Sequence, residues 1–439
     1  MTPESQAEVG NTALYNLLQV IHPEFGIVPS PEGNRFNNYF TRDAMRSGMV
    51  VSERLDLESA RLIIPAIIKS QEVAISHIGV KTDPETGERK DLLPHEVHSK
   101  NSPQDRLIEL EKDHPVKVNS DGIREMVTWF ADDVNSLFRS NVASTWKALA
   151  RLEGIDSQRE YYLQRWPVVL RTLRHDIEVG DIDGDGLIES MPKGRNGFFI
   201  NPTWKDSGDA YLTEDGRLPE PPYKYLTNNS DFMLSLLKTA EIARTLGYND
   251  IAADLENRFQ RNQKLLHEIF WMEEHQFMAP LIEGDGRQVQ FIGDDVVFGL
   301  YGKIFYLKEG RIIIKRLKKR DMFTNWGIRT RSSLSKQFLR SAYQRGAVWD
   351  YITNMAAEGA ENYGDYSFAK ELDNSSTALE QEEGFPELAT IYKNGTTKKT
   401  YKENGVPVAC KPMAWTAATS HARRMAHTPY VTAPLATRN

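Results

Sequence analysis

The sequence predicts an all-α fold, because its clearest regular signal is a helical spacing of apolar residues that occurs in pairs of segments. Apolar side chains recur at intervals of three and four over residues 233–243, which predicts a helix. Gly247, which can adopt the left-handed backbone conformation, is then placed to end this helix. A second helix follows over residues 249–269, so the two helices form an antiparallel hairpin. The same arrangement recurs on either side of Gly154. With no composition break, residues 1–439 are predicted to form one domain of stacked helical hairpins.

Further helices and several long loops complete the predicted organisation. The loops are rich in Gly, Pro, Asp, Asn and Trp, and loops of such length usually carry function. We expect the additional helices over residues 54–75, 310–320, 336–360 and 411–427, and the long loops over residues 29–46, 79–104, 181–229 and 360–400.

Composition excludes several classes of protein. The 54 basic and 61 acidic residues give a net charge of −7 without a long block of one sign, which disfavours a dedicated nucleic-acid-binding protein. One cysteine, Cys410, cannot form an internal disulfide bond, and residues 1–18 lack the pattern of a secretory signal. No apolar run is long enough to cross a membrane. We therefore expect a cytoplasmic protein without membrane or nucleic-acid partners.

The densest polar region contains carboxylates beside tryptophan. It comprises DIDGDGLIES at residues 181–190 and NPTWKDSGDA at residues 201–210. Acid catalysis on a sugar acetal needs a protonated carboxyl group, and an apolar wall raises a carboxyl pKa by desolvation. Asp206 beside Trp204 meets that need. The alternative is that the Ser-Gly-Asp sequence forms an ordinary turn with solvated acids.

Two segments contain residue types that could bind a metal. Asp181, Asp183 and Asp185 resemble the first half of a calcium loop, but Pro192 stands where a bidentate glutamate belongs. A structural hairpin is therefore the preferred interpretation, and bound calcium is the alternative. The PHEVH segment at residues 94–98 lacks the His-Glu-x-x-His spacing of a zinc helix. No metal is predicted to be required.

A second candidate acid is Glu387, in the segment GFPELATIYKNG, 181 residues after Asp206. Hydrolysis with inversion requires a second carboxylate, about 6.5 to 9.5 Å from the first, so that a water molecule fits between them. Taken alone, the Pro-Glu-Leu triplet is equally consistent with the acidic first turn of a helix.

A charged pair flanked by aromatic residues lies in the segment NNYFTRDAM. Arg42 and Asp43 follow Tyr39 and Phe40, so they could hydrogen-bond to sugar hydroxyls beside aromatic rings. The alternative is a buried ion pair at a helix start.

Taken in order, these segments resemble the helical-barrel exo-glycosidases. The resemblance is to the amylo-alpha-1,6-glucosidase and glucoamylase-like enzymes of glycoside hydrolase families fifteen and sixty-three and, in size, to the small mannosylglycerate and glucosylglycerate hydrolases. The segments that carry it are FTRDAM (40–45), DGDGLIES (183–190), TWKDSGDA (203–210), FGLYG (298–302), NWGIRT (325–330), YQRGAVW (343–349), GFPEL (384–388) and CKPMAW (410–415).

The resemblance implies an (α/α)6 barrel whose long active-site loops contain short strands. It implies that Asp206 is the general acid and Glu387 the general base, although Asp209 is a rival for the acid. The substrate-binding residues implied by it are Tyr39, Arg42, Asp43, Trp204, Asp209, Trp326, Arg329 and Trp349.

This chain departs from the family pattern in the residues expected to read sugar hydroxyls. It has Asn228 and Asn229 where glutamate and glutamine are usual, Asp350 in place of proline, and Met413 in place of glutamine. Specificity for glucose is therefore not carried over.

The resemblance implies an inverting, exo-acting α-glycoside hydrolase. Such an enzyme would release a terminal sugar, glucose or mannose, from a small α-glycoside or oligosaccharide, and with glucose it would be an α-glucosidase. Such a reaction needs two carboxyl groups and water, so no cofactor is expected. A phosphorylase on a similar barrel and a noncatalytic carbohydrate-binding barrel are the alternatives. A sugar epimerase is disfavoured, because the ten histidines form no acid and base pair within these motifs.

Overall fold

The computed structural model describes residues 12–31, 36, 38–82, 89–98, 116–118, 124–129, 131–191, 201–392, 397–398, 402–403, 406–407 and 409–426. None of the helices within these ranges is both long and apolar enough to span a lipid bilayer.

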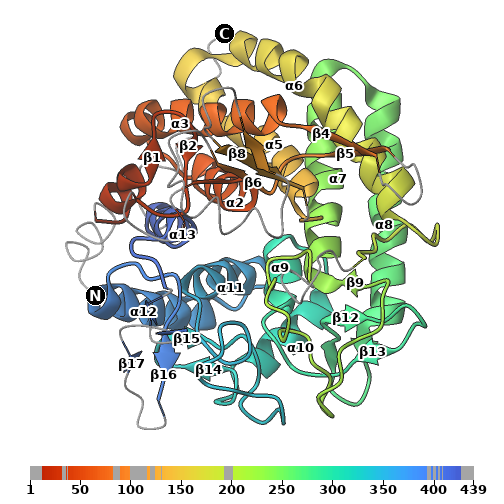
Figure 1. The fold of residues 1–439 in the computed structure, drawn as a ribbon, viewed down its shortest axis with the longest axis vertical. Helices are drawn as coiled ribbons and strands as arrows, with labels where there is room; N and C mark the ends of the chain where they lie inside the picture. The colour runs from red at the N-terminus through yellow and green to blue at the C-terminus, as the bar shows by residue number, and fades with distance from the viewer. Residues whose placement is uncertain are drawn as a thin grey trace.

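Six helices form a closed inner ring. Each contacts the next along the chain, and the last contacts the first, so that α13 lies beside α2 (Figure 1). The inner helices are α2 (Thr41–Ser52), α5 (Val134–Glu153), α7 (Leu226–Leu246), α9 (Val296–Tyr301), α11 (Asp350–Asn362) and α13 (Ala414–Ala426).

Outer helices alternate with the inner ones along the chain. They return the polypeptide to the same end of the ring each time, so the architecture is an (α/α)6 barrel, as predicted. The outer helices are residues 12–19, α3 (Leu57–Ser76), α6 (Ile155–His175), α8 (Asn249–Phe270), α10 (Leu307–Leu317) and α12 (Tyr366–Glu383), and a π-helical turn, η1 (Asp176–Gly180), extends α6.

Short strands lie in the loops. One sheet has the order β3-β6-β8-β7, a second has the order β13-β12-β9, and the others are two-stranded. The strands are β1 (Ile21–His22), β2 (Gly26–Ile27), β3 (Tyr39–Phe40), β4 (Gly79–Thr82), β5 (Arg89–Leu92), β6 (Glu96–His98), β7 (Val116–Val118), β8 (Arg124–Thr128), β9 (Lys224–Tyr225), β10 (Trp271–Met272), β11 (Phe277–Met278), β12 (Leu281–Ile282), β13 (Gln288–Val289), β14 (Phe323–Thr324), β15 (Gly327–Ile328), β16 (Thr390–Ile391), β17 (Thr397–Lys398), β18 (Lys402–Glu403) and β19 (Val406–Pro407).

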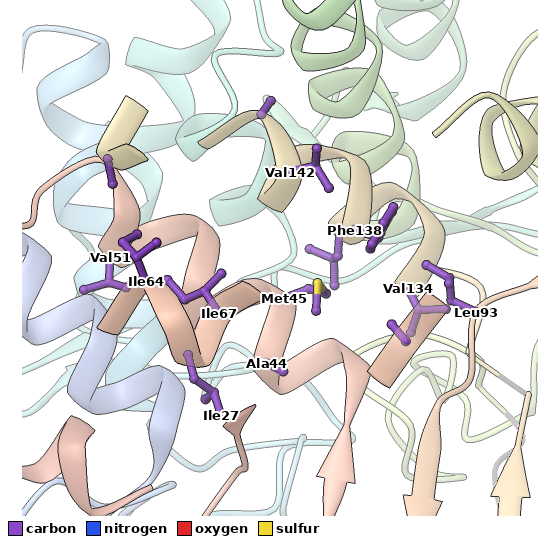
Figure 2. Close-up of a cluster of buried hydrophobic side chains, with 14 of the residues drawn as sticks. Ile27, Ala44, Met45, Val51, Ile64, Ile67, Leu93, Val134, Phe138 and Val142 are labelled. Carbon is purple, nitrogen blue, oxygen red and sulfur yellow. The ribbon is translucent and has the colours of Figure 1, made fainter. Parts of the chain in front are cut away.

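Two large apolar clusters hold the two layers together. One lies among the helix over residues 12–19, α2, α3, α5 and the helices that pack on them. Figure 2 shows part of this cluster, where Met45 of α2, Ile67 of α3 and Phe138 of α5 meet. The second joins α8 through α13 and includes Phe298 and Met355. Burial of such side chains stabilises a fold by about 1.5 to 3 kcal/mol each, so these clusters are the main source of stability.

Helix ends follow local sequence signals. Asp56 caps α3 by accepting hydrogen bonds from the amides of Glu58 and Ser59, both at 2.9 Å. The hairpin predicted around Gly247 is confirmed, because α7 ends there with φ +90° and α8 begins at Asn249.

Three of the expected segment assignments were wrong. The expected loop over 29–46 ends at Phe40, because α2 begins at Thr41. Residues 336–349 are loop, and only Asp350–Asn362 of the expected helix over 336–360 forms. Gly346 allows this loop to fold on itself, because a Cβ there would lie 2.4 Å from the carbonyl oxygen of Leu339. The expected loop over 360–400 contains α12, which Asp365 caps and Gly384 terminates. The helices expected near 54–75, 310–320 and 411–427 are confirmed within a few residues.

A buried carboxyl pair joins α11 to α12. Asp350 at the start of α11 is fully buried, and its nearest acidic neighbour is Glu380, which accepts a hydrogen bond from Ser376 and lies 3.4 Å from Arg424. Burial, followed by the charge of Glu380, raises the pKa of Asp350 well above its usual range. Asp350 therefore carries a proton in the folded protein at pH values where the unfolded chain has lost it.

We predict that Asp350→Asn stabilises the protein increasingly as pH rises. Since the folded wild type binds one more proton than the unfolded chain above pH ~4, its free energy of unfolding falls with pH, and asparagine removes this dependence. The expected gain is ~1 kcal/mol or more near pH ~8 and close to zero near pH ~4. Urea unfolding of both proteins across this range measures it. If the free energies of unfolding of the two proteins differed by the same amount at every pH, the proton assigned to Asp350 in the folded protein would be contradicted.

Candidate active site

The inner helices all begin at one end of the barrel, because every outer helix returns the chain. Residues in the first turn of these helices or just before it therefore converge, and the positive ends of six helix dipoles favour carboxylates there. The residues so placed are Arg42 and Asp43 on α2, Asp133 before α5, Asn228 on α7, Asp295 before α9, Trp349 before α11 and Met413 before α13.

Asp206 lies in the loop that precedes α7 and faces Arg42. The distance from Arg42 Nη1 to Asp206 Oδ2 is 3.3 Å, and the Asp206 side chain retains 27% of its exposure. Burial raises the pKa of Asp206 to about 6, with Arg42 opposing the rise and the charges of Asp133 and Glu96 adding to it. A carboxyl group with this pKa can hold a proton near neutral pH and donate it.

A buried lysine fixes the loop that carries Asp206. Lys205 Nζ lies 2.5 Å from Asp294 Oδ1 and 2.7 Å from Asp295 Oδ2, and it also donates to the carbonyl of Thr330. Tyr211 donates to the second oxygen of Asp295 at 3.0 Å. The peptide beside Asp206 is thereby tied to the start of α9.

The loop before α11 holds the other side of the acid loop. The side-chain oxygen of Gln344 accepts hydrogen bonds from the amide and hydroxyl of Ser207 at 2.9 and 2.8 Å, and its nitrogen donates to the carbonyl of Trp204 at 2.7 Å. Asp206 therefore lies between Lys205, which is fixed by ion pairs, and Ser207, which is fixed by hydrogen bonds.

Asp209, the rival for the acid, has a different environment. Its carboxylate accepts from Arg345 Nε at 2.9 Å and lies 2.7 Å from Nη2, and its side chain is 46% exposed. Asp209 therefore lies in an ion pair with Arg345 near the surface, whereas Asp206 lies beside Arg42 at the helix N-termini.

Glu387 is oriented by two hydrogen bonds. It is only 1% exposed, Oε1 accepts from the hydroxyl of Tyr343, and Oε2 accepts from the amide of Cys410 at 3.0 Å. Burial, then the charges of Glu387 and Asp206, raises the pKa of Tyr343 well above its usual range. Tyr343 therefore remains a hydrogen-bond donor to Glu387, and the charges of both carboxyl groups contribute to the rise of its pKa.

Arg42 and Asp43 complete the carboxyl cluster. Arg42 Nε donates to Asp133 Oδ2 at 2.6 Å, whereas its buried Nη2 has no protein acceptor among the described residues. Burial raises the pKa of Asp43 well above its usual range; Arg42 opposes this rise, and Glu387 and Asp206 add to it. Asp43, Asp206 and Glu387 thus occupy one electrostatic neighbourhood, with a free N–H available to a ligand.

The predicted aromatic residues lie mostly behind these polar groups. Trp204 is buried against Phe298, Trp349 and Tyr351, with ring centroids 5.6 to 5.7 Å apart. The Trp349 indole donates to the carbonyl of Tyr343 at 2.9 Å. In these positions the two tryptophans support the site loops from the core.

The remaining predicted residues also make structural contacts. Tyr39 is fully buried and donates to the carbonyl of Ser70 at 2.8 Å, which joins β3 to α3. Trp326 is partly buried against the small apolar cluster that contains Val348. Arg329 is buried near Phe338 and makes no hydrogen bond to a carboxylate within the part of the chain that the structure describes.

Sequence reasoning did not assign roles to Tyr343, Gln344, Lys205 or Asp133. Tyr343 and Gln344 belong to the segment YQRGAVW, which contributed to the resemblance, and Lys205 lies inside TWKDSGDA. Asp133 occupies the position before the first residue of α5, where acidic residues are common. The available signal was therefore position within a motif, but the partners of these residues lie more than 40 positions away.

The acidic loop considered for calcium contains an internal cation. Oxygen atoms of Asp181, Asp183 and Glu189 lie within 4.8 Å of one another. Lys224 Nζ lies 2.5 Å from Asp183 and 3.2 Å from Asp185, and it also pairs with Glu189. Lys224 thus places one positive charge among the acidic side chains of this loop.

Comparison with known proteins places most of the chain in one family. The sequence model of the family described as "Mannosylglycerate hydrolase MGH1-like glycoside hydrolase domain" matches residues 85–400, well over half of the chain. The search of curated proteins yields no match.

Solved structures share the fold at low identity. The GH63 mannosylglycerate hydrolase from Thermus thermophilus in complex with Tris has a TM-score of 0.64 and 15% identity, covering 94% of this chain and 99% of that one. The same enzyme in complex with glucose gives the same values. A rhamnosidase from Klebsiella oxytoca with rhamnose bound has a TM-score of 0.59 and 12% identity, covering 98% of this chain and 65% of that one. The fold is shared with these enzymes, and the family match shows that the chain belongs to the mannosylglycerate hydrolase MGH1-like glycoside hydrolases.

Proposed function

We propose that this protein is an inverting, exo-acting glycoside hydrolase that releases a terminal α-linked sugar, glucose or mannose, from a small glycoside. The observation that carries the proposal is the pair Asp206 and Glu387, which come from distant loops and have opposite environments. Asp206 is a partly buried carboxyl group with a raised pKa, whereas Glu387 is fixed by Tyr343 and the Cys410 amide. Mannosylglycerate hydrolase activity in a neighbour of the same fold supports the reaction class.

The proposed reaction uses these two groups as acid and base. Asp206 gives its proton to the glycosidic oxygen as the bond to the anomeric carbon breaks. Glu387 takes a proton from a water molecule that attacks the opposite face of that carbon. The proton lost by Asp206 is thus balanced by the one gained by Glu387, and the product has the inverted anomeric configuration.

Substrate binding is assigned to the buried end of the cluster. The unpartnered Nη2 of Arg42 offers a donor to sugar hydroxyls, and the carboxyl group of Asp43, whose pKa is raised, offers an acceptor. One turn further along α2, Arg46 is buried and pairs with Asp231 of α7 at 2.5 to 3.0 Å. We take this buried pair as the closed end of the sugar site, and a closed end supports action at a chain end.

We predict that Asp206→Asn and Glu387→Gln each lower kcat by about a thousand-fold, because each removes one proton-transfer group while keeping its shape. Sugar release from a panel of small α-glycosides measures this, and NMR identifies the first anomer formed, which should be β. Asp209→Asn is the matched control and should keep kcat within about tenfold. An α-anomer as the first product would overturn inversion, and a larger loss in Asp209→Asn would reassign the acid. Sugar binding without turnover in the wild type would favour a binding protein.

The pH dependence of kcat/KM should report the protonation of Asp206. Since the acid must carry its proton, activity should fall as pH rises through about 6 in the free enzyme. In Glu96→Gln the neighbouring charge is lost and the hydrogen bond to His98 can be kept, so this descending limb should move to lower pH. A limb that does not move, or that moves to higher pH, would show that Asp206 does not control it.

No cofactor is proposed, because both proton transfers are assigned to protein carboxyl groups. We therefore predict that dialysis against EDTA changes neither kcat nor the melting temperature, since Lys224 already forms ion pairs with Asp183, Asp185 and Glu189. A loss of either quantity that calcium restores would instead support a metal at Asp181 and Asp183.

A further inference from the structure

The carboxylate of Glu214 joins the two loops that hold the proposed catalytic groups. Glu214 lies eight residues after Asp206, and its side chain is 35% exposed. Its Oε1 accepts hydrogen bonds from the hydroxyl of Ser335 at 2.5 Å and from Arg331 Nη2 at 3.1 Å, and its Oε2 accepts one from the amide of Lys336 at 2.7 Å. One carboxylate therefore takes three donors from a segment 117 to 122 residues away in sequence.

Arg331 is the buried partner in this contact. It is fully buried, its Cζ lies 3.7 Å from the ring centroid of Phe291, and its Nη1 donates to the carbonyl of Leu212 at 2.8 Å. Burial opposes ionisation of Glu214, but the hydrogen bonds from its three donors outweigh burial and lower its pKa. Glu214 is therefore a carboxylate near neutral pH, and hydrogen bonds to a charged acceptor are stronger than those to a neutral one.

The two segments joined by Glu214 also meet beside the site. The side-chain oxygen of Gln344 accepts from the amide and hydroxyl of Ser207, and Tyr343 donates to Glu387. Between these contacts and Glu214, neither segment contains a helix or a strand. A segment without regular structure is held in place by its contacts, so the contact at Glu214 helps to fix where Ser207 and Tyr343 lie.

We propose that Glu214 is a positioning residue, which keeps Asp206 within reach of the glycosidic oxygen by joining the acid loop to the loop of Tyr343 and Gln344. This role rests on the proposed hydrolase function. A general acid must come within hydrogen-bond distance of the oxygen that it protonates, and a misplacement of about 1 Å can lower a rate about a hundred-fold. Glu214 acts through its hydrogen bonds and takes no part in proton transfer.

The first test needs no turnover. Hydrogen exchange is followed by mass spectrometry in peptides that contain Lys336 and Ser207, for the wild type, Glu214→Gln and Glu220→Gln. Glu220 is the matched control, because it lies on the same loop, is 64% exposed and comes no closer than 3.7 Å to Arg287. We expect exchange about tenfold faster in both peptides of Glu214→Gln only, because loss of the charged acceptor frees both segments. Faster exchange at Lys336 alone would overturn the proposal, since the contact would then be local.

The second test compares leaving groups. The same three proteins and Asp206→Asn are assayed on the α-glycoside that the wild type hydrolyses fastest and on the α-fluoride of the same sugar, since fluoride leaves without a proton from the acid. We expect Glu214→Gln to lower kcat about ten- to a hundred-fold on the glycoside and less than about threefold on the fluoride. KM should be unchanged and the melting temperature should stay within about 3 °C of the wild type. Asp206→Asn should show the same selective loss, and Glu220→Gln none.

The other outcomes are equally informative. Equal losses on both substrates would indicate a general structural role and overturn the proposal, and so would no loss on either. If Glu214→Gln does not fold, Ser335→Ala, which removes one donor and keeps the charge, should show the same selective loss in weaker form. A wild type that hydrolyses neither substrate would overturn the hydrolase function, whereas hydrogen exchange would still decide whether Glu214 joins the two segments.

Discussion

The site depends on the guanidinium of Arg42, which is shared between Asp133 and Asp206. This one buried cation lies at the start of α2, reaches the residue before α5 and contacts the proposed acid in a loop more than 160 residues away. Without it, Asp43, Asp133 and Asp206 would lose the cation that their charges share, and a folded protein tolerates unpaired acids of this kind poorly. The same contact limits how far burial raises the pKa of Asp206, so the protein sets acid strength through the balance of one cation against several acids.

The two proposed catalytic groups are positioned by different physical means. Asp206 is held through its neighbours, because Lys205 is locked to Asp294 and Asp295 and Ser207 is locked to Gln344. Glu387 is held directly, through its own carboxylate oxygens. A proton donor needs a desolvated carboxyl group with few hydrogen bonds to its charged form, whereas a base needs its charged form oriented by donors. The two modes of attachment suit these two needs.

Two buried arginines, Arg42 and Arg329, have N–H groups that lack a hydrogen-bond partner among the described residues. These atoms are Nη2 of Arg42 and Nε and Nη1 of Arg329, and all three are buried. The large apolar clusters between the helix layers supply enough stability to tolerate such groups. The helix layers thus provide stability, and the loops at the helix N-termini retain unsatisfied polar atoms that ligands can use.

The sequence by itself determined the class of the fold and the position of most helices, because a helix face and its caps are local patterns. Gly247 and Asn249 mark a hairpin without reference to the rest of the chain. Motif order also identified Arg42, Asp43, Asp206 and Glu387 as residues to examine. The tertiary structure decided that residues 336–349 form a loop and that Asp209 is bound by Arg345. It also decided that Lys205, Gln344 and Tyr343 position the site, since each acts through a partner far away in sequence. Charge balance and burial are sums over such distant neighbours, so only the folded chain determines them.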